Sequence, residues 1–154
     1  MTLRPLRPED RDLSFAFVSG LSPETRRNRL LGGMIAITPE YIESLVRVDY
    51  SRAMAIAATT LLERETMVGA ARYILDPDRG SAEFAIVVAD AWHGRGIGKR
   101  LMSKLIEVAR RRGLKRLHGE ILAMNRPMLG LVRSLGFTLS RHEDPMLSRA
   151  TLEL

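Results

Sequence analysis

The chain of 154 residues contains no cysteine, and aromatic residues make up only 5% of it. Without cysteine, the protein can form no disulfide, bind no zinc ion through thiolates and use no cysteine nucleophile. A reducing cytoplasm is therefore the expected compartment. The low aromatic content also provides no stacking platform for single-stranded nucleic acid.

Long apolar runs are also missing. A membrane-spanning helix needs about 18 consecutive apolar residues, and the sequence has no such run and no apolar segment near Met1. We therefore expect neither a membrane span nor a signal peptide. Length and a 45% hydrophobic content predict one globular domain covering residues 1–154.

The charged and titratable residues narrow the ligand class. The formal net charge of +6 suits an anionic ligand, but the arginines spread from Arg4 to Arg149 and form no nucleic-acid patch. The three histidines are His93, His118 and His142. They are scattered without ligand spacing, so we expect no metal site.

Apolar periodicity and capping residues predict alternating helices and strands. Ser22 and Thr38, each followed by proline and glutamate, are typical of helix starts. One helix is predicted to begin at Glu9 and Asp10, and further helices are predicted to cover residues 22–31, 38–48, 97–112 and 125–135. The predicted strands cover residues 2–8, 53–61, 66–75, 82–88, 114–122, 137–142 and 149–154. The helix from residue 97 has the clearest apolar face.

The stretch WHGRGIGKR, from Trp92 to Arg100, has glycine at every second position. A P-loop would need glycine at His93 and serine or threonine at Arg100. A dinucleotide fingerprint would need glycine at Lys99 or Leu101. Both motifs are therefore absent.

What remains is a strand, a glycine-rich turn and a helix N-terminus, where unpaired amides and the positive end of the helix dipole converge. The stretch contains Gly94, Gly96 and Gly98 and the cations Arg95, Lys99 and Arg100. Because glycine has no Cβ, the amides can approach a pyrophosphate closely. A flexible turn is the alternative interpretation.

Residues 83–137 present, in order, a strand, this loop, a long helix, a second strand, Asn125 and the segment Leu135-Gly136-Phe137. This order resembles the core of the GNAT superfamily of N-acetyltransferases, with its [QR]-x-x-G-x-[GA] loop. The stretches LRPLRPEDRD, GLSPETRRNRL, VDYSRAMAIAA and GAARYILDPD extend the likeness. With them the chain is similar to the acetyltransferase domain of bacterial Pat-type protein lysine acetyltransferases.

The resemblance implies an α/β fold with a mixed, mostly antiparallel sheet of six to seven strands and helices on both faces. Acetyl-CoA would lie between two splayed parallel strands, residues 82–88 and 114–122. Backbone groups of Val87 and Val88 would hold the pantetheine arm, and Asn125 would contact the arm near the thioester. The pyrophosphate would contact His93, Gly94, Arg95, Gly96, Ile97, Gly98, Lys99 and Arg100. Asn125 can equally be a helix N-cap.

Two positions depart from the family pattern. His93 replaces the usual glutamine or arginine at the start of the loop, which matters little because backbone amides do most of the binding. Val132 stands seven residues after Asn125, where the family often has a tyrosine that protonates the leaving thiolate. A CoA thiol is acidic enough to leave without much help.

The expected reaction needs a general base, because an alkyl ammonium is neutral in roughly one molecule in 2,500 at pH 7. Glu83 matches the glutamate that serves as base in Pat-type enzymes, and Glu120 is the reserve candidate. The alternative for Glu83 is a sheet-edge residue paired with Arg72, and for Glu120 it is a purely structural role.

The expected acceptor is a protein lysine, with an acyl-CoA synthetase as a candidate target. The mixed charges of residues 1–50 suit a docking surface better than a polyamine site. The alternatives are a small-amine or antibiotic N-acetyltransferase and a regulatory module that binds acyl-CoA without turnover. Acyl chain length and oligomeric state stay open, a homodimer included.

Overall fold

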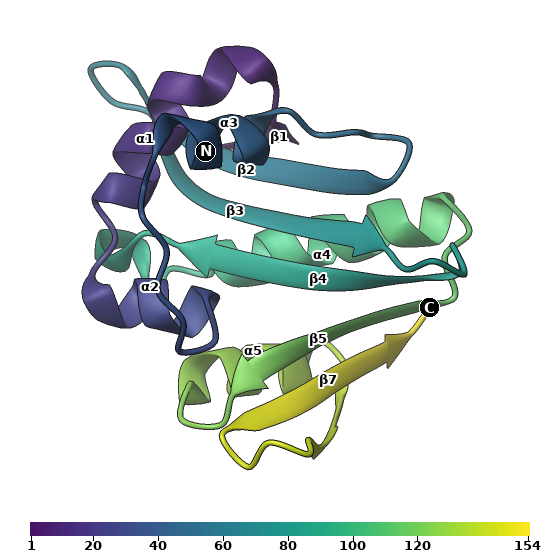
Figure 1. The fold of residues 1–154 in the computed structure, drawn as a ribbon. Coiled ribbons are helices and arrows are strands. Elements are labelled where there is room, and N and C mark those ends of the chain that lie inside the picture. The colour runs from purple at the N-terminus through teal and green to yellow at the C-terminus, as the bar shows by residue number, and fades with distance from the viewer.

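The computed structural model describes residues 1–154, and its seven strands form one sheet (Figure 1). The strand order is β1-β2-β3-β4-β5-β7-β6, and only the β4–β5 pair is parallel. The expected mixed, mostly antiparallel sheet with a parallel pair is confirmed.

The strands are β1 (Thr2–Pro5), β2 (Ala53–Leu61), β3 (Glu65–Leu75), β4 (Ser81–Val88), β5 (Arg116–Leu122), β6 (Thr138–Arg141) and β7 (Leu147–Glu153). The α-helices are α1 (Arg11–Ser19), α2 (Pro23–Arg29), α3 (Pro39–Val46), α4 (Ile97–Arg111) and α5 (Arg126–Ser134). Two 3-10 turns, η1 (Pro8–Asp10) and η2 (Asp90–Trp92), precede α1 and α4. None of the helices is long and apolar enough to span a membrane.

Three helices begin at the capping residues that the sequence predicts. The side chains of Ser22 and Thr38 each accept a hydrogen bond at 3.1 Å from the backbone amide three residues later. Asn125 accepts one from the amide of Met128 at 3.4 Å. Because a cap depends on local contacts only, these helix starts can be recognised without knowing the fold.

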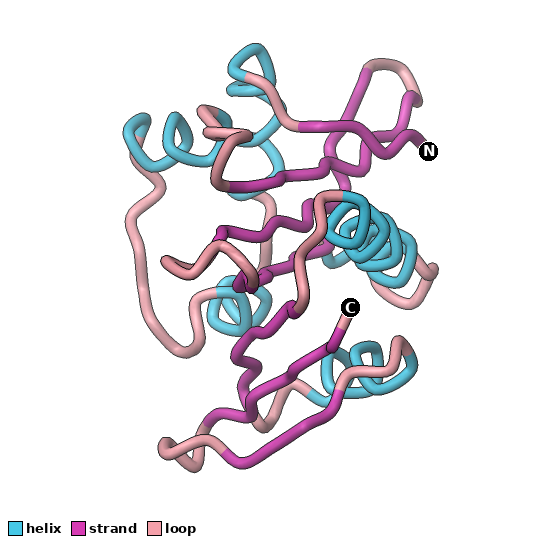
Figure 2. The backbone as a smooth tube through the Cα atoms, turned by 90° about the vertical axis from the view of Figure 1, so that its right-hand side faces the viewer, coloured by secondary structure: helices cyan, strands magenta, loops and turns pink.

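The helices cover the two faces of the sheet unequally. Figure 2 shows the sheet edge-on, with α4 and α5 on one side and α1, α2 and α3 on the other. The second group lies over β1–β4, and no helix covers the same face of β5, β7 and β6 (Figure 1). One face therefore has a hydrophobic core along its length, and the other is partly open.

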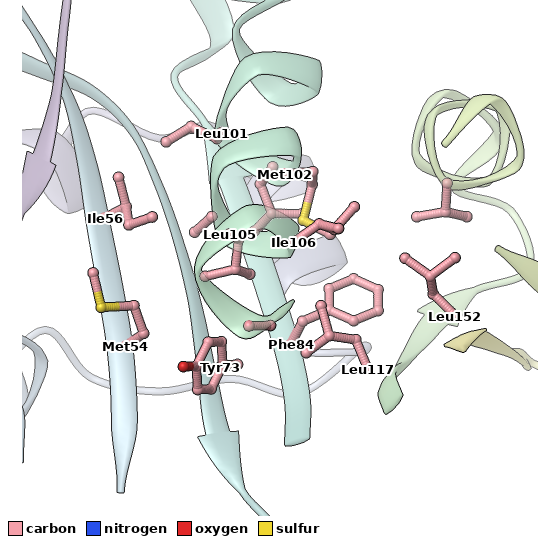
Figure 3. Packing of buried hydrophobic residues seen from close by; sticks show 14 of the residues in the cluster. Met54, Ile56, Tyr73, Phe84, Leu101, Met102, Leu105, Ile106, Leu117 and Leu152 are labelled. Atoms are coloured by element: carbon pink, nitrogen blue, oxygen red, sulfur yellow. The ribbon is translucent and has the colours of Figure 1, made fainter. Parts of the chain in front are cut away.

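The main core lies between the sheet and α4 with α5 (Figure 3). The apolar face of α4 is fully buried, through Ile97, Leu101, Met102, Leu105, Ile106 and Ala109. These side chains pack against the alternate residues of β2, β3 and β4 that point to this face, such as Ile56, Tyr73 and Phe84. Burial of each large side chain contributes about 1.5–3 kcal/mol, so this layer is the main stabilising element.

A buried ion pair holds the N-terminal strand to the first helical turn. Asp10, 1% exposed, accepts hydrogen bonds from both terminal nitrogens of Arg4, at 2.8 and 2.7 Å, and from the amide of Arg7 at 3.0 Å. Burial acts to raise the pKa of Asp10, but the bonds from Arg4 and Arg7 outweigh it and lower the pKa.

Asp10→Ala should lower the free energy of unfolding by about 3 kcal/mol, because the partly buried guanidinium of Arg4 then loses its main carboxylate partner. Urea denaturation measures the change. Since the folded-state pKa of Asp10 is depressed, its contribution is present above pH 4 or so and is lost as pH falls further. The matched control is Glu65→Gln, at the outer contact of Arg4, which should cost less than about 1 kcal/mol. Equal effects of the two variants would contradict the assignment.

Candidate active site

The parallel pairing of β4 and β5 is short. Only three residue pairs form, from Ser81 with Arg116 to Glu83 with His118. Beyond this point β4 continues along β3, to Val88, and β5 continues along β7, to Leu122. The strands part after Glu83, so backbone groups of β4 that face the gap have no strand partner. This is the V-shaped gap expected for the pantetheine arm.

The glycine loop joins this gap to the N-terminus of α4. Gly94 and Gly96 adopt positive φ values of 75° and 80°, and a Cβ at either position would meet no atom within 4 Å. The first bond of α4 runs from the amide of Arg100 to the carbonyl of Gly96, which leaves the amides of Ile97, Gly98 and Lys99 without a partner in the helix. Free amides beside open space fit a pyrophosphate, and we call these three amides together with Gly94 and Gly96 the anion cradle.

Gly98 has a different role from the one the sequence suggests. A Cβ there would lie 3.2 Å from the side chain of Leu131 and 3.8 Å from those of Ile86 and Val88. Its missing side chain therefore lets α4 pack closely against α5 and β4, rather than opening the loop to a ligand. The amide of Gly98 is still part of the anion cradle.

The cations of the loop lie at the surface. Arg95, Lys99 and Arg100 are exposed, and the guanidinium of Arg95 lies 4.6 Å from the centre of the Trp92 ring. Trp92 packs against the core, as expected of a residue beside the loop. Nε2 of His93 lies 2.7 Å from the carbonyl oxygen of Val88, so this side chain closes the loop onto the end of β4.

Asn125 and Val132, which the family pattern places near the thioester, lie at the N-cap of α5 and within α5. Asn125 is the N-cap of α5, the alternative that the sequence left open, which is compatible with a contact to the pantetheine arm. Val132 is fully buried in the core, so no acidic side chain replaces the missing tyrosine at this position.

Glu83 lies at the last pair before the strands part. Its side chain is exposed, on the α1–α3 face of the sheet, and makes no ion pair or hydrogen bond. The alternative pairing with Arg72 does not form, and Arg72 donates instead to the carbonyl of Leu45 at 3.4 Å. The carboxylate is therefore free to accept a proton from a ligand.

Other titratable groups nearby are already engaged. Glu120, on the same face of β5, lies 3.1 Å from Nε2 of His142, and His118 lies 2.6 Å from the carboxylate of Asp76. These contacts make Glu120 less available than Glu83 as a base. No group of three or more histidine, aspartate or glutamate side chains is placed to hold a metal ion.

A cavity lies between the sheet and helices α1, α2 and α3, and its lining begins at Ala85, two residues along β4 from Glu83. The space between its lining atoms is about 690 Å³, part of which is open to solvent, and 13 of its 17 lining residues are hydrophobic. Ala85 and Val87, on the same face of β4 as Glu83, form part of its floor. The other four lining residues are Ser14, Arg26, Arg29 and Arg72.

The sequence did not predict these three arginines as site residues. Arg26 and Arg29 come from α2 and Arg72 from β3, so only the folded chain brings them together. A weak signal exists for Arg72, since it interrupts the otherwise apolar strand GAARYIL. Nothing local distinguishes Arg29 from the exposed arginines around it.

The model of the acetyltransferase (GNAT) family matches residues 31–137, so the chain belongs to this family. Its relatives are named acetyltransferases, and the chain is an acetyl-CoA-dependent N-acetyltransferase. The residues that line the gap and the loop fit that co-substrate, through the free amides and the open space at Gly94 and Gly96.

Individual proteins support this assignment. The acetyltransferase PA5475 of Pseudomonas aeruginosa is 38% identical over 143 residues, 92% of this chain and 77% of that protein. The L-methionine sulfoximine/L-methionine sulfone acetyltransferase of the same organism is 40% identical over 62 residues, 40% of this chain and 36% of that protein. The GNAT domain of S. lividans PAT has the same fold, with a TM-score of 0.89 and 24% identity over 99% of this chain and 89% of that one.

Gly96→Asp should weaken acetyl-CoA binding by at least about 10-fold, because a carboxylate at the N-cap of α4 repels the pyrophosphate and a Cβ enters the space that it occupies. Calorimetry measures the affinity. The matched control is Gly113→Asp, at the other end of α4, where φ is 79° and the Cβ also meets no atom. Equal affinities in the two variants would contradict the anion cradle.

Proposed function

We propose that the chain acetylates a primary amine by direct attack on the thioester, with Glu83 as the general base. The position of Glu83 carries this proposal. Its unpaired carboxylate stands where β4 and β5 part, on the face that also forms the floor of the cavity. An amine in the cavity can therefore reach both the carboxylate and the end of the gap.

Acetyl-CoA supplies the acetyl group as a reactive thioester. Glu83 accepts a proton from the amine nitrogen as the new nitrogen–carbon bond forms and the carbon–sulfur bond breaks. The electron pair of that bond leaves on sulfur, and the thiolate takes its proton from water, since Val132 offers none. Glu83 then releases its proton to solvent, which restores the carboxylate.

Glu83→Gln should lower kcat by about 10²-fold or more and leave acetyl-CoA affinity unchanged, as expected when a base is lost but the shape is kept. Higher pH should restore part of the rate, because more of the amine is then neutral. Thiol release and calorimetry measure the two effects. The control Glu120→Gln should change kcat much less. An unchanged rate in Glu83→Gln would move the base to Glu120 or to water.

Two acceptor classes are proposed. The largely apolar cavity near Glu83 supports a small amine, and one relative of this chain is named for acetylating methionine derivatives. A protein lysine, the acceptor that the sequence analysis put first, is the second candidate. It is supported by the exposure of Glu83, by the open face of β5 and by the likeness to the GNAT domain of S. lividans PAT.

A panel of acceptors separates these classes. Spermidine and aminoglycosides should be poor acceptors in either case, because no carboxylate lines the cavity to attract a polycation. If a protein lysine is the natural acceptor, a cytoplasmic protein such as an acyl-CoA synthetase should gain acetyl-lysine, detected by mass. Efficient turnover of small amines, at kcat/KM of about 10⁴ M⁻¹s⁻¹ or more, without protein acetylation would exclude the lysine candidate.

A further inference from the structure

The cavity near Glu83 carries positive charge without any negative partner. Three of its lining residues are arginines, and none is an aspartate or glutamate. Arg72 makes one hydrogen bond, to the carbonyl of Leu45, and Arg29 makes none. Arg26 bonds to the carbonyl of Ser19 at 2.9 Å, but its Nε is buried without a partner.

Three arginines without an acidic partner in an apolar lining are electrostatically unfavourable. Burial and the neighbouring charge of Arg29 lower the pKa of Arg72 to about 10, which measures how poorly the cation is solvated there. A guanidinium presents planar pairs of donors that match a carboxylate, so an anionic ligand would satisfy groups that the protein leaves unsatisfied. The rest of the lining is hydrophobic, so the ligand must also have an apolar part.

The register of β3 and β4 places the positive charge of Arg72 close to Glu83. Arg72 on β3 lies opposite Ala85, and Glu83 lies opposite Ile74, so Arg72 and Glu83 are diagonal neighbours. Both point to the α1–α3 face, and diagonal neighbours lie about 7–8 Å apart, with their Cβ atoms somewhat closer. Because the two side chains are this close, a ligand that contacts Glu83 with its amine and Arg72 with an anionic group must carry the two groups only a few bonds apart.

We propose that the acceptor is a free α-amino acid with an apolar side chain, acetylated on its α-amine. Arg72, with Arg29 beside it, binds the α-carboxylate, and the apolar side chain packs in the cavity among Phe17, Leu45 and Met67. The α-amine then lies toward Glu83 and the gap. This inference rests on the proposed amine acetylation and names the acceptor of that site.

L-methionine and L-methioninamide test the proposal, because they differ only in the carboxylate. Without the negative charge, the amide's amine is less basic and more of it is neutral, so a lower rate with the amide cannot come from protonation. Thiol release with acetyl-CoA should give a kcat/KM at least about 10-fold higher for L-methionine. Similar values for the two acceptors would overturn the proposal.

Arg72→Gln tests whether Arg72 is the group that binds the α-carboxylate of the acceptor. The variant should raise KM for L-methionine by about 10- to 100-fold, as expected for a lost charge-assisted bond, and should change kcat/KM for the amide by less than about 3-fold. Arg72→Lys should restore part of the loss. The matched control Arg64→Gln, exposed in the turn between β2 and β3, should change neither. An equal loss for both acceptors in Arg72→Gln would indicate a structural role and overturn the proposal.

A binding measurement makes the test independent of catalysis. N-acetyl-L-methionine should bind to the wild-type protein in the presence of CoA, and Arg72→Gln should abolish that binding while its melting temperature stays the same or rises. Absence of binding to the wild-type protein would overturn the proposal. Acetylation of protein lysines with no turnover of amino acids would also overturn it and leave the amine acetylation standing. Absence of thiol release with every amine and protein would instead refute the proposed function.

Discussion

The parallel pairing of β4 with β5 ends at Glu83 and His118, and the arrangement of the site depends on this early end. Phe84, the next residue of β4, lies where the strands part. Its ring packs onto Gly119 of β5, where a Cβ would lie 2.7 Å from the ring. The ring of Phe137 packs edge-on against it, with the ring centroids 5.2 Å apart. A glycine at position 119 therefore leaves room for the Phe84 ring at the point where the strands separate.

The two faces of the sheet have different roles. Alternate residues of β4 point to the dry core under α4, which fixes the strand and the N-terminus of the helix. The residues between them, Glu83, Ala85 and Val87, point to the opposite face, where Ala85 and Val87 form part of the cavity floor. One strand thus leads to the anion cradle at its end, carries Glu83, the proposed base, near its start and forms part of the cavity floor between them.

The sequence predicts the elements of this fold well, because their signals are local. Caps at Ser22, Thr38 and Asn125 mark three helix starts, and every predicted helix and strand occurs, with most ends within two residues of those observed. The glycine loop before α4 is also visible in the sequence, since its residues are consecutive, and its role as a pyrophosphate site stays a prediction. The role of Gly98 is not visible there, because it depends on Leu131 of a different helix.

The cavity is the part that the sequence could not predict. Its arginines come from separate elements, and an unpaired cation in an apolar lining looks, in sequence, like any surface arginine. The pairing of Arg72 with Glu83 was a reasonable alternative, since the residues are diagonal neighbours. Geometry decides against it, because Arg72 turns toward Leu45 and the α3 side of the cavity.

The carboxylate of Asp90 connects helix α2, which lines the cavity, to the segment directly before the anion cradle. Asp90, directly before the loop, accepts hydrogen bonds from the hydroxyls of Ser22 and Thr25, at 2.7 and 2.6 Å, and from the amide of Ser22 at 2.9 Å. Burial acts to raise the pKa of Asp90, but these bonds outweigh it and hold the pKa at about 2, so the carboxylate stays charged at any ordinary pH. Helix α2, which carries Arg26 and Arg29, is therefore tied at its first turn to the residue that leads into the pyrophosphate loop. The arginines of the cavity and the glycine loop, which come from distant parts of the sequence, are thus held in a fixed relation by the bonds of Asp90 to α2.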